Sequence, residues 1–472
     1  MRFRPALVLA GAALFLLSAV CIPFGARAGR GSPLKRFDLI AGWRERPAGP
    51  TIISEKIVRA LRQARAIPKT RRPAVIPKIV DIPAVAVVQP IELTEETALD
   101  AFFAALHRQR AEGGMVRIAY YGDSIVEGDL ITQDLRASFQ KDFGGGGAGY
   151  LPIASEVAPF RITVTHDFSL EWKTVSILQR NRAFPVGIAG QVFVAPCPRK
   201  EDTDPPCEAW VEYKAPTRWP SLKQFKTLRL FYSRAEAPAA VEYTANGGEP
   251  ASIDLEPGEE IRQIVLKFDP PAKKVRLTLR SRGAFPVYGV SWDGDGGVEV
   301  DNFALRGNSG LPLIEIPAGV LQEFDRLLDY RLIVLHFGTN VTSPDLSDYS
   351  WYRAGMAKVV RHFRNAFPNA SILLIGAGDR SYKVDAEYVT MPTIPILVET
   401  QRKVAADTGA AFWDLYGAMG GLNSMVGWVN HKPVLAALDY THLSAAGSRR
   451  VAEFLYNALM SRFKAYEENL AR

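Results

Sequence analysis

Five residues in four short motifs have the types that nucleophilic attack on an ester carbonyl requires. Ser124 can act as the nucleophile, His442 as the base that removes its proton, and Asp439 as the group that fixes the tautomer of that base. The N–H groups of Ser124 and Gly307 and the side-chain amide of Asn340 can donate hydrogen bonds to the oxyanion that then develops. Their types and order predict a serine esterase site.

Each motif also has an ordinary structural explanation. A Gly-Asp-Ser motif before a helix is a common N-cap, and an Asp-x-x-His motif fits a turn with a capping carboxylate. The Gly-Thr-Asn motif ending at Asn340 is typical of a β-turn, and Gly307 suits a tight bend. One motif alone favours these explanations. All four together, each at a predicted strand end, favour catalysis.

The elements that must position Ser124 are a strand and a helix. A short apolar run from Val116 ends in Gly122-Asp-Ser, and Ile131, Leu135 and Phe139 then recur on one helical face. Ser124 is therefore expected on the turn between the carboxyl end of a strand and a helix N-terminus. Open α/β sheets place their binding sites at that edge.

Strands and helices alternate again in the second half of the chain, which predicts an α/β domain with a parallel sheet. The folded body is expected to start near Thr94, with a helix through Leu106. The later predicted strands are 331–336, 371–375 and 411–414, and the later predicted helices are 352–367, 394–408 and one that begins after Ser444.

A different pattern interrupts this domain. After the glycine-rich stretch 143–152, short strand-like runs without helical periodicity extend from Arg161 to Trp292, and Asn246-Gly-Gly248 predicts a hairpin turn. The α/β pattern resumes at Val298. We therefore expect a jelly-roll β-sandwich over residues 151–297, inserted into an α/β domain of residues 94–150 and 298–472. Its tryptophans and tyrosines can stack on sugar rings, although most are expected in its core.

The N-terminal segment predicts export. Residues 1–28 have a basic start, an apolar run and an Ala-Arg-Ala end, as in a signal peptide, and an uncleaved membrane anchor is the second interpretation. Residues 29–93 form a Pro-rich basic tether, with thirteen Lys/Arg against three acidic residues between Arg30 and Lys78. The location is then the periplasm or cell envelope, with possible membrane association through this segment.

Charge and cysteine usage exclude other classes of protein. The rest of the chain is nearly neutral despite the net charge of +7, which excludes a nucleic-acid-binding face on the folded body. Of three cysteines, Cys21 leaves with the signal peptide, and Cys197 and Cys207 are expected to form a disulfide. No metal-ligand spacing is present, and no metal or cofactor is expected.

The four motifs together resemble those of the SGNH (GDSL-type) hydrolase superfamily, over about residues 115–140 and 298–463. The stretch from Gly122 through the glycine-rich run to Tyr150 is similar to the periplasmic peptidoglycan O-acetylesterases, in which a carbohydrate-binding-module-like sandwich follows the first motif. The resemblance implies a flavodoxin-like catalytic domain. It also implies an O-acetylated glycan polymer, peptidoglycan or another envelope polysaccharide, as partner. Two positions depart from it, Ile125 in place of His and Val341 in place of Glu.

Three further features near the motifs need an interpretation. Asp123 and His336 can line the same cleft, but His336 suits a buried, hydrogen-bonded position better. The run Asp293-Gly-Asp-Gly-Gly297 lacks the later ligands of an EF-hand loop and predicts a hairpin turn instead of a calcium site.

The sequence thus predicts an exported carbohydrate O-acetylesterase. A carbohydrate O-acetyltransferase of the same fold uses the same groups and is the first alternative. A polysaccharide- or wall-binding protein with a vestigial triad is the second. The insert is expected to hold polymer over the cleft. Its replacement by a linker should therefore leave the hydrolysis of small esters within about tenfold, and activity on the polymer should fall much further.

Overall fold

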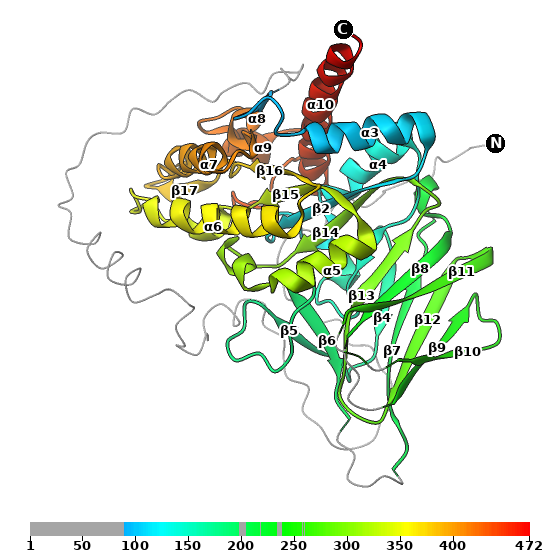
Figure 1. Cartoon of the computed structure of the whole chain (residues 1–472). Coiled ribbons are helices and arrows are strands. Elements are labelled where there is room, and N and C mark those ends of the chain that lie inside the picture. The colour runs from blue at the N-terminus through cyan, green and yellow to red at the C-terminus, as the bar shows by residue number, and fades with distance from the viewer. Residues whose placement is uncertain (1–88, 198–203, 218, 234–237, 257, 259) are drawn as a thin grey trace, which may run out of the picture. The chain divides into compact units, whose positions relative to one another are not determined.

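The computed structural model describes residues 89–472, except residues 198–203, 218, 234–237, 257 and 259 (Figure 1). The predicted signal peptide and almost the whole predicted tether lie outside the described residues. Within the described part, no helix combines the length and the apolar character that a membrane span requires.

One mixed sheet forms the centre of the α/β domain. Its strands are β1 (Ile91–Glu92), β2 (Met115–Gly122), β14 (Gly297–Ala304), β15 (Tyr330–His336), β16 (Ser371–Ile375) and β19 (Ala411–Trp413). They lie in the order β1-β19-β16-β15-β2-β14, and all neighbours except β1 and β19 are parallel. Numbered along the chain, the five parallel strands take the order 2-1-3-4-5, which is the predicted flavodoxin-like order.

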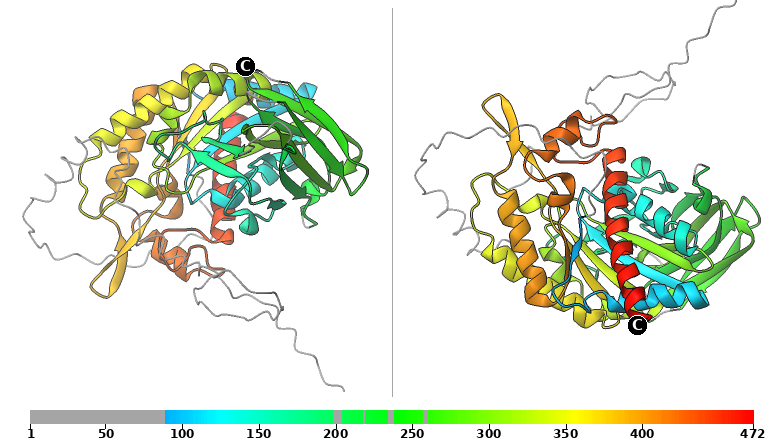
Figure 2. Two further views of the ribbon diagram at one scale, coloured as in Figure 1. Left: turned by 90° about the horizontal axis from the view of Figure 1, so that it is seen from below. Right: turned by 90° about the horizontal axis from the view of Figure 1, so that it is seen from above.

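Helices cover both faces of this sheet (Figures 1 and 2). Helices α5 (Ala318–Leu328), α6 (Ser350–Ala366) and α7 (Ile394–Thr408) share one core, and α3 (Asp100–Glu112), α4 (Thr132–Phe143) and α10 (Ala445–Leu470) share the other. Along β2, the neighbours Tyr120 and Tyr121 enter opposite cores because side chains alternate across a strand. This double covering explains why the parallel strands are continuously apolar.

Smaller elements complete the domain at the carboxyl end of the sheet. They are the hairpin β17 (Ser381–Val384) with β18 (Glu387–Thr390), and helices α8 (Leu415–Met419) and α9 (Ser424–Asn430).

Two predicted boundaries were wrong. The folded body begins before Thr94, because Ile91 and Glu92 pair with β19, and Thr94 bonds the Ala410 carbonyl (3.0 Å) instead of starting α3. No α-helix begins directly after Ser124, since a turn of 3-10 helix (Glu127–Asp129) intervenes and α4 starts only at Thr132. The N-terminus of α4 therefore does not lie at Ser124.

The insert is a sandwich of two antiparallel sheets. Its strands are β3 (Gly149–Leu151), β4 (Thr165–Phe168), β5 (Lys173–Ser176), β6 (Gln191–Ala195), β7 (Cys207–Lys214), β8 (Phe225–Tyr232), β9 (Ala239–Ala245), β10 (Ala251–Leu255), β11 (Arg262–Ala272), β12 (Lys274–Ser281) and β13 (Phe285–Asp293). One sheet has the order β10-β9-β12-β7-β4, and the other β11-β8-β13-β6-β5. The hairpin turn at Asn246 is confirmed, with Asn246 and Gly247 at φ +55° and +76°.

The sandwich shares its outer apolar face with the α/β domain. Phe231 of β8 and Tyr288 of β13 pack on Phe324 of α5, with ring centroids 5.4 and 5.8 Å apart. Every residue of β13 is buried, because one face lines the sandwich core and the other meets the α/β domain. A shared apolar core of this kind fixes the two parts against each other more firmly than a polar domain contact would.

The predicted hairpin at Asp293–Gly297 was wrong. β13 pairs with sandwich strands and β14 pairs with β2, so this run carries the chain from one sheet to another. Asp293 is buried and forms ion pairs with Arg117 and Arg229. Within the described residues, no group of His, Cys, Asp and Glu side chains could hold a metal ion.

Candidate active site

Ser124 lies on the turn directly after β2, at the carboxyl edge of the parallel sheet. The turn is held by Asp123, whose carbonyl accepts from the N–H of Val126 (3.1 Å) and whose carboxylate accepts from the N–H of Ile125 (3.0 Å). Gly122 is required for space, because a Cβ there would lie 2.6 Å from a methyl group of Val126. This tight packing presents the Ser124 hydroxyl at the strand end.

The structure brings Ser124, His442 and Asp439 into one hydrogen-bonded chain. The Ser124 hydroxyl lies 2.9 Å from Nε2 of His442, and Nδ1 of His442 lies 2.6 Å from the Asp439 carboxylate. Burial opposes the ionisation of Asp439, but hydrogen bonds from the ring and the backbone N–H of His442 outweigh it and lower the pKa of Asp439. An ionised Asp439 holds the proton of His442 on Nδ1 and leaves Nε2 free to accept the serine proton.

The loop that carries Asp439 and His442 is fixed from two sides. Ser444 caps α10 by accepting from the N–H of Gly447 (3.1 Å), and its own hydroxyl donates to the Val434 carbonyl (2.6 Å). On the other side, the ring of Tyr440 stacks on Tyr388 of β18, with centroids 3.6 Å apart and planes at 8°. The hairpin β17–β18 therefore supports the loop between the two catalytic candidates.

Two of the predicted oxyanion donors belong to the backbone. Gly307 lies at φ +76°, a conformation that glycine adopts without strain, and it is exposed. Its loop is joined to the loop of Ser124 because the N–H of Leu305 donates to the Gly122 carbonyl (3.0 Å). Within the described part of the chain, neither the N–H of Ser124 nor that of Gly307 has a hydrogen-bond acceptor. Both remain available for an oxyanion.

The third predicted donor, Asn340, already has partners. Its amide nitrogen donates to the Asp123 carboxylate (2.9 Å) and to the Asn308 carbonyl (3.0 Å). Because a primary amide has two hydrogens, donation to an oxyanion requires Asn340 to share or exchange one of these bonds. The two acceptors hold the amide at the mouth of the site, between β2 and β15.

Asp123 is a structural partner of this donor and does not face open solvent. Its side chain is only 1% exposed, and burial raises its pKa to about 6, against hydrogen bonds from Ile125 and Asn340 that favour the charged form. His336 also lies in the interior and bonds the Tyr120 hydroxyl (3.0 Å) through Nδ1, and burial lowers its pKa to about 4. The buried position of His336 is confirmed, and neither residue lines an open cleft.

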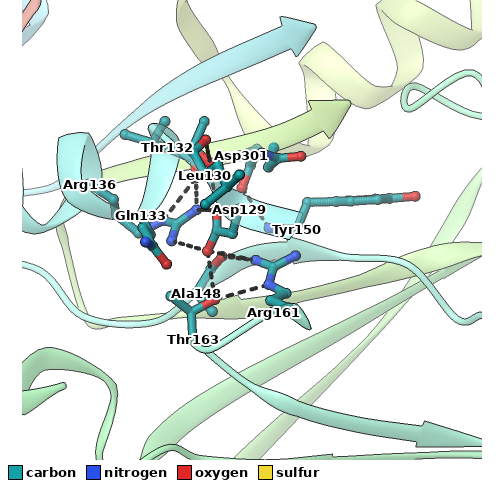
Figure 3. A network of polar contacts seen from close by, with 12 residues as sticks. Asp129, Leu130, Thr132, Gln133, Arg136, Ala148, Tyr150, Arg161, Thr163 and Asp301 are labelled. Carbon is teal, nitrogen blue, oxygen red and sulfur yellow. Dashed lines mark hydrogen bonds and ion pairs between the residues drawn. The ribbon is translucent and has the colours of Figure 1, made fainter. Parts of the chain in front are cut away.

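The turn after Ser124 is anchored by a buried ionic cluster that the sequence analysis missed (Figure 3). Asp129, fully buried, accepts two hydrogen bonds from Arg136 (both 2.9 Å), one from Arg161 (3.1 Å) and one from Thr163 (2.6 Å). Burial alone would raise the pKa of Asp129, but the guanidinium groups of Arg136 and Arg161 lower it far below its usual range. Arg161 and Thr163 belong to the sandwich.

Asp129 and its neighbours adopt unfavourable backbone conformations. Asp129 and Ile131 lie at φ +69° and +64°, in the left-handed region that residues with a Cβ rarely adopt. Such residues persist only where the surroundings compensate for the strain, and the contacts of Asp129 supply that compensation here. The only feature of the sequence that indicates this cluster is an acidic residue soon after Ser124. Its role cannot be recognised until its distant partners are known.

The predicted disulfide between Cys197 and Cys207 is confirmed. It connects the end of β6 to the start of β7, which belong to different sheets of the sandwich. The bond therefore ties the two sheets together at one end.

The arrangement at Ser124 has the parts that acyl transfer needs. A hydroxyl, a base and an orienting carboxylate lie in hydrogen-bond contact, and two free N–H groups and an amide stand beside them. Ser124 and Asn340 follow the neighbouring strands β2 and β15, where the strand order reverses and open α/β sheets form their crevice, and Gly307 follows β14 on the other side of β2.

Comparison with known proteins supports this chemistry. Residues 276–450 match the family described as GDSL-like Lipase/Acylhydrolase. The matched segment contains Gly307, Asn340, Asp439 and His442, whereas Ser124 lies before it, on the far side of the insert in the sequence. A search of curated proteins finds no match.

Among solved structures, a peptidoglycan O-acetylesterase is 22% identical to this chain with a TM-score of 0.63, over 79% of this chain and 99% of its own. A family two carbohydrate esterase from Cellvibrio japonicus is 11% identical, with a TM-score of 0.26, over 64% of this chain and 98% of its own. The first likeness shows a shared fold. Residues 276–450 match the GDSL-like lipase/acylhydrolase family, the fold is consistent with that of an SGNH hydrolase, and the two findings together support an esterase.

Proposed function

We propose that this protein is a serine esterase that removes O-acetyl groups from a cell-envelope carbohydrate, and that peptidoglycan is its substrate. The observation that carries the proposal is the hydrogen-bonded chain from Ser124 through His442 to Asp439, with distances of 2.9 and 2.6 Å. The solved structure with the shared fold is that of a peptidoglycan O-acetylesterase, which supports this choice of substrate.

The first half of the proposed reaction transfers the acetyl group to the enzyme. The Ser124 oxygen attacks the acetyl carbonyl while Nε2 of His442 takes the hydroxyl proton. The N–H groups of Ser124 and Gly307, with the amide of Asn340, stabilise the oxyanion. The bond between the carbonyl carbon and the sugar oxygen then breaks, and His442 returns the proton to that oxygen.

The second half releases acetate. Water gives a proton to Nε2 of His442 and attacks the acetyl group on Ser124, and the proton returns to Ser124 as acetate leaves. The Asp439 carboxylate stabilises the imidazolium in both halves. If a sugar hydroxyl replaced water in this step, the same groups would catalyse acetyl transfer.

The proposed substrate also requires a location outside the cytoplasm. The basic start and the apolar run of residues 1–28 support export to the periplasm or cell envelope. The residues between position 29 and β1 would then serve as a tether to the catalytic region.

The decisive experiment measures acetate release from O-acetylated peptidoglycan, O-acetylated xylan and 4-nitrophenyl acetate, with Ser124→Ala as control. We expect release from peptidoglycan to exceed release from xylan by about tenfold or more, a difference of roughly 1.4 kcal/mol in transition-state binding. Release from the small ester alone would overturn the substrate assignment. Equal release by Ser124→Ala would overturn the serine mechanism.

A further inference from the structure

A cavity of about 480 Å³ opens between the turn after Ser124 and the first strands of the sandwich. This volume falls within the range of about 300–1,000 Å³ that small-molecule sites occupy. The α/β domain contributes Glu127 and Arg306 to its walls, and the sandwich contributes Trp172 and Gln191. The cavity therefore lies between the two parts of the chain.

Chain connectivity places this cavity beside the ester-cleaving site. Glu127 lies on the same turn as Ser124, and Arg306 directly precedes Gly307. The two side chains form an ion pair (2.7 Å) and both line the cavity. A ligand that places one group on Ser124 can therefore extend its next unit into the cavity.

The walls carry almost no unbalanced charge. Arg306 is paired with Glu127, and Arg161 shares the Asp129 carboxylate with Arg136, which leaves one surplus positive charge. Glu156, which has no ion-pair partner within the described residues, offsets that charge on the lining. His166 adds none at neutral pH, because burial lowers its pKa to about 4 and outweighs the hydrogen bond from Nε2 to the Ile153 carbonyl (3.0 Å), which favours the charged form. Such walls suit an uncharged ligand better than an anion.

The same walls combine an aromatic ring with polar side chains. Trp172 is half-buried, and its indole N–H donates to the Trp210 carbonyl (2.9 Å), which fixes the ring. The amide of Gln191 has no partner within the described residues and can both donate and accept. A fatty acyl chain would leave such polar groups unsatisfied. A pyranose packs its C–H face on an aromatic ring and bonds amides through its hydroxyls.

We infer that this cavity binds an uncharged pyranose unit of the glycan chain, next to the acetylated unit at Ser124, with Trp172 as the stacking platform and Gln191 as a hydrogen-bonding side chain. The inference rests on the proposed function only for the statement that the substrate is a glycan. Part of the polymer would then bind at the interface between the α/β domain and the sandwich.

The test compares Trp172→Ala and Gln191→Ala with Trp210→Ala. Trp210 is on the same sandwich but packs under the guanidinium of Arg276, 3.8 Å from its ring centroid, and does not line the cavity. For the two cavity variants we expect kcat/KM on acetylated glycan polymer to fall at least about tenfold more than kcat/KM on 4-nitrophenyl acetate. The control should leave this ratio unchanged. Equal losses on both substrates, or no loss on the polymer, would overturn the inference.

A binding measurement separates this inference from the proposed function. Chitotetraose, which carries no ester, is titrated into Ser124→Ala and into the double variant Ser124→Ala/Trp172→Ala by calorimetry. We expect binding to the first and at least about tenfold weaker binding to the second. If the wild-type protein deacetylates no glycan but this difference appears, the proposed function fails and the cavity assignment stands. If chitotetraose binds equally well to the two variants, or binds to neither of them, the cavity assignment fails.

Discussion

Arg161 of the sandwich donates a hydrogen bond of 3.1 Å to the carboxylate of Asp129, on the turn that follows Ser124. The two side chains are almost or completely buried, at 8% and 0% exposed. The insert therefore does more than overhang the site, because it holds the segment that carries the nucleophile. This contact argues against the expectation that a linker could replace the insert with only a small loss on small esters.

Arg161→Met is expected to lower kcat on 4-nitrophenyl acetate by roughly tenfold with little change in KM, since a misplaced nucleophile slows chemistry more than binding. Unfolding free energy should fall by about 3 kcal/mol, as when one partner of a buried ion pair is removed. The control is Arg182→Met, which removes another ion pair between sandwich and α/β domain, to Glu315 (2.7 Å). A wild-type kcat in Arg161→Met would contradict the positioning role.

Ser124→Ala and His442→Ala should each lose several orders of magnitude in kcat, because members of a triad act as a unit. Asp439→Asn should lose on the order of 10⁴-fold, since the amide can hold the wrong tautomer of His442. Steady-state kinetics with a chromogenic acetate ester measure all three. Turnover near the wild-type rate in Ser124→Ala would exclude the proposed mechanism.

Asn340→Ala is expected to lower kcat by about 10²-fold or more with a nearly unchanged KM, as for other single oxyanion donors. Binding of a non-hydrolysable substrate analogue should stay the same, because the interaction strengthens only in the transition state. A rise in KM alone would show that Asn340 binds the ground state instead.

Asp123→Asn tests the buried carboxylate beside Asn340. A carboxylate accepts from both Ile125 and Asn340, whereas an amide has a single acceptor oxygen, so kcat should fall by roughly tenfold. The folded-state pKa of Asp123, raised to about 6, means that folding disfavours its ionised form. That destabilisation is complete above pH 6 and absent below about pH 4.

Relative to the wild-type protein, Asp123→Asn should therefore gain about 1.4 kcal/mol in unfolding free energy between pH 5 and pH 8. Denaturant titrations at the two pH values measure this difference. Asp379→Asn is the matched control, because burial also raises the pKa of Asp379. Its carboxylate accepts hydrogen bonds from Thr390, Ser424 and the N–H of Met425, and not from Asn340. Asp379→Asn should likewise change the pH dependence of the unfolding free energy and leave kcat unaffected. A pH-independent effect of Asp123→Asn would argue against the raised pKa.

Reduction of the Cys197–Cys207 disulfide should loosen the sandwich without unfolding the α/β domain. The two cysteines are 10 residues apart, and a loop of that size contributes about 2–3 kcal/mol. Thermal unfolding with and without dithiothreitol, followed by tryptophan fluorescence, measures the shift. Non-reducing mass spectrometry of the mature protein, without residues 1–28, should find no free thiol, and two free thiols in exported material would contradict an oxidising location.

The sequence predicted elements best where local chemistry decides them. Helix α7 begins and ends as predicted, at Ile394 and Thr408, because Pro395 suits the first turn and Gly409 adopts the left-handed conformation that ends a helix. The cap at Ser444 was predicted for the same reason. The four motifs could be found because their residue types together suit one chemistry, although each alone has an ordinary structural explanation. The prediction that all four follow strands was wrong for Asp439 and His442, which lie on the loop between α9 and α10.

Features that depend on distant partners could not be predicted. Nothing local shows that Asp129 contacts Arg161, or that Ile131 adopts a positive φ directly before α4. The acceptors of Asn340 come from two other loops, so its hydrogen bonds follow only from the assembled sheet. The run after Asp293 was predicted as a hairpin because glycine-rich composition marks a turn but does not reveal which sheet the next strand joins.

The pairing of β1 with β19 has a consequence for the order in which the protein acquires activity. Ile91 and Glu92 are made early, but their partners Phe412 and Trp413 leave the ribosome only when most of the chain has been synthesised. The sandwich strands, contiguous from Gly149 to Asp293, are available much sooner, and chains fold from the N-terminus as they emerge. Ser124 remains without its base until His442 has been synthesised, and an interrupted chain that lacks His442 cannot cleave an ester by this chemistry.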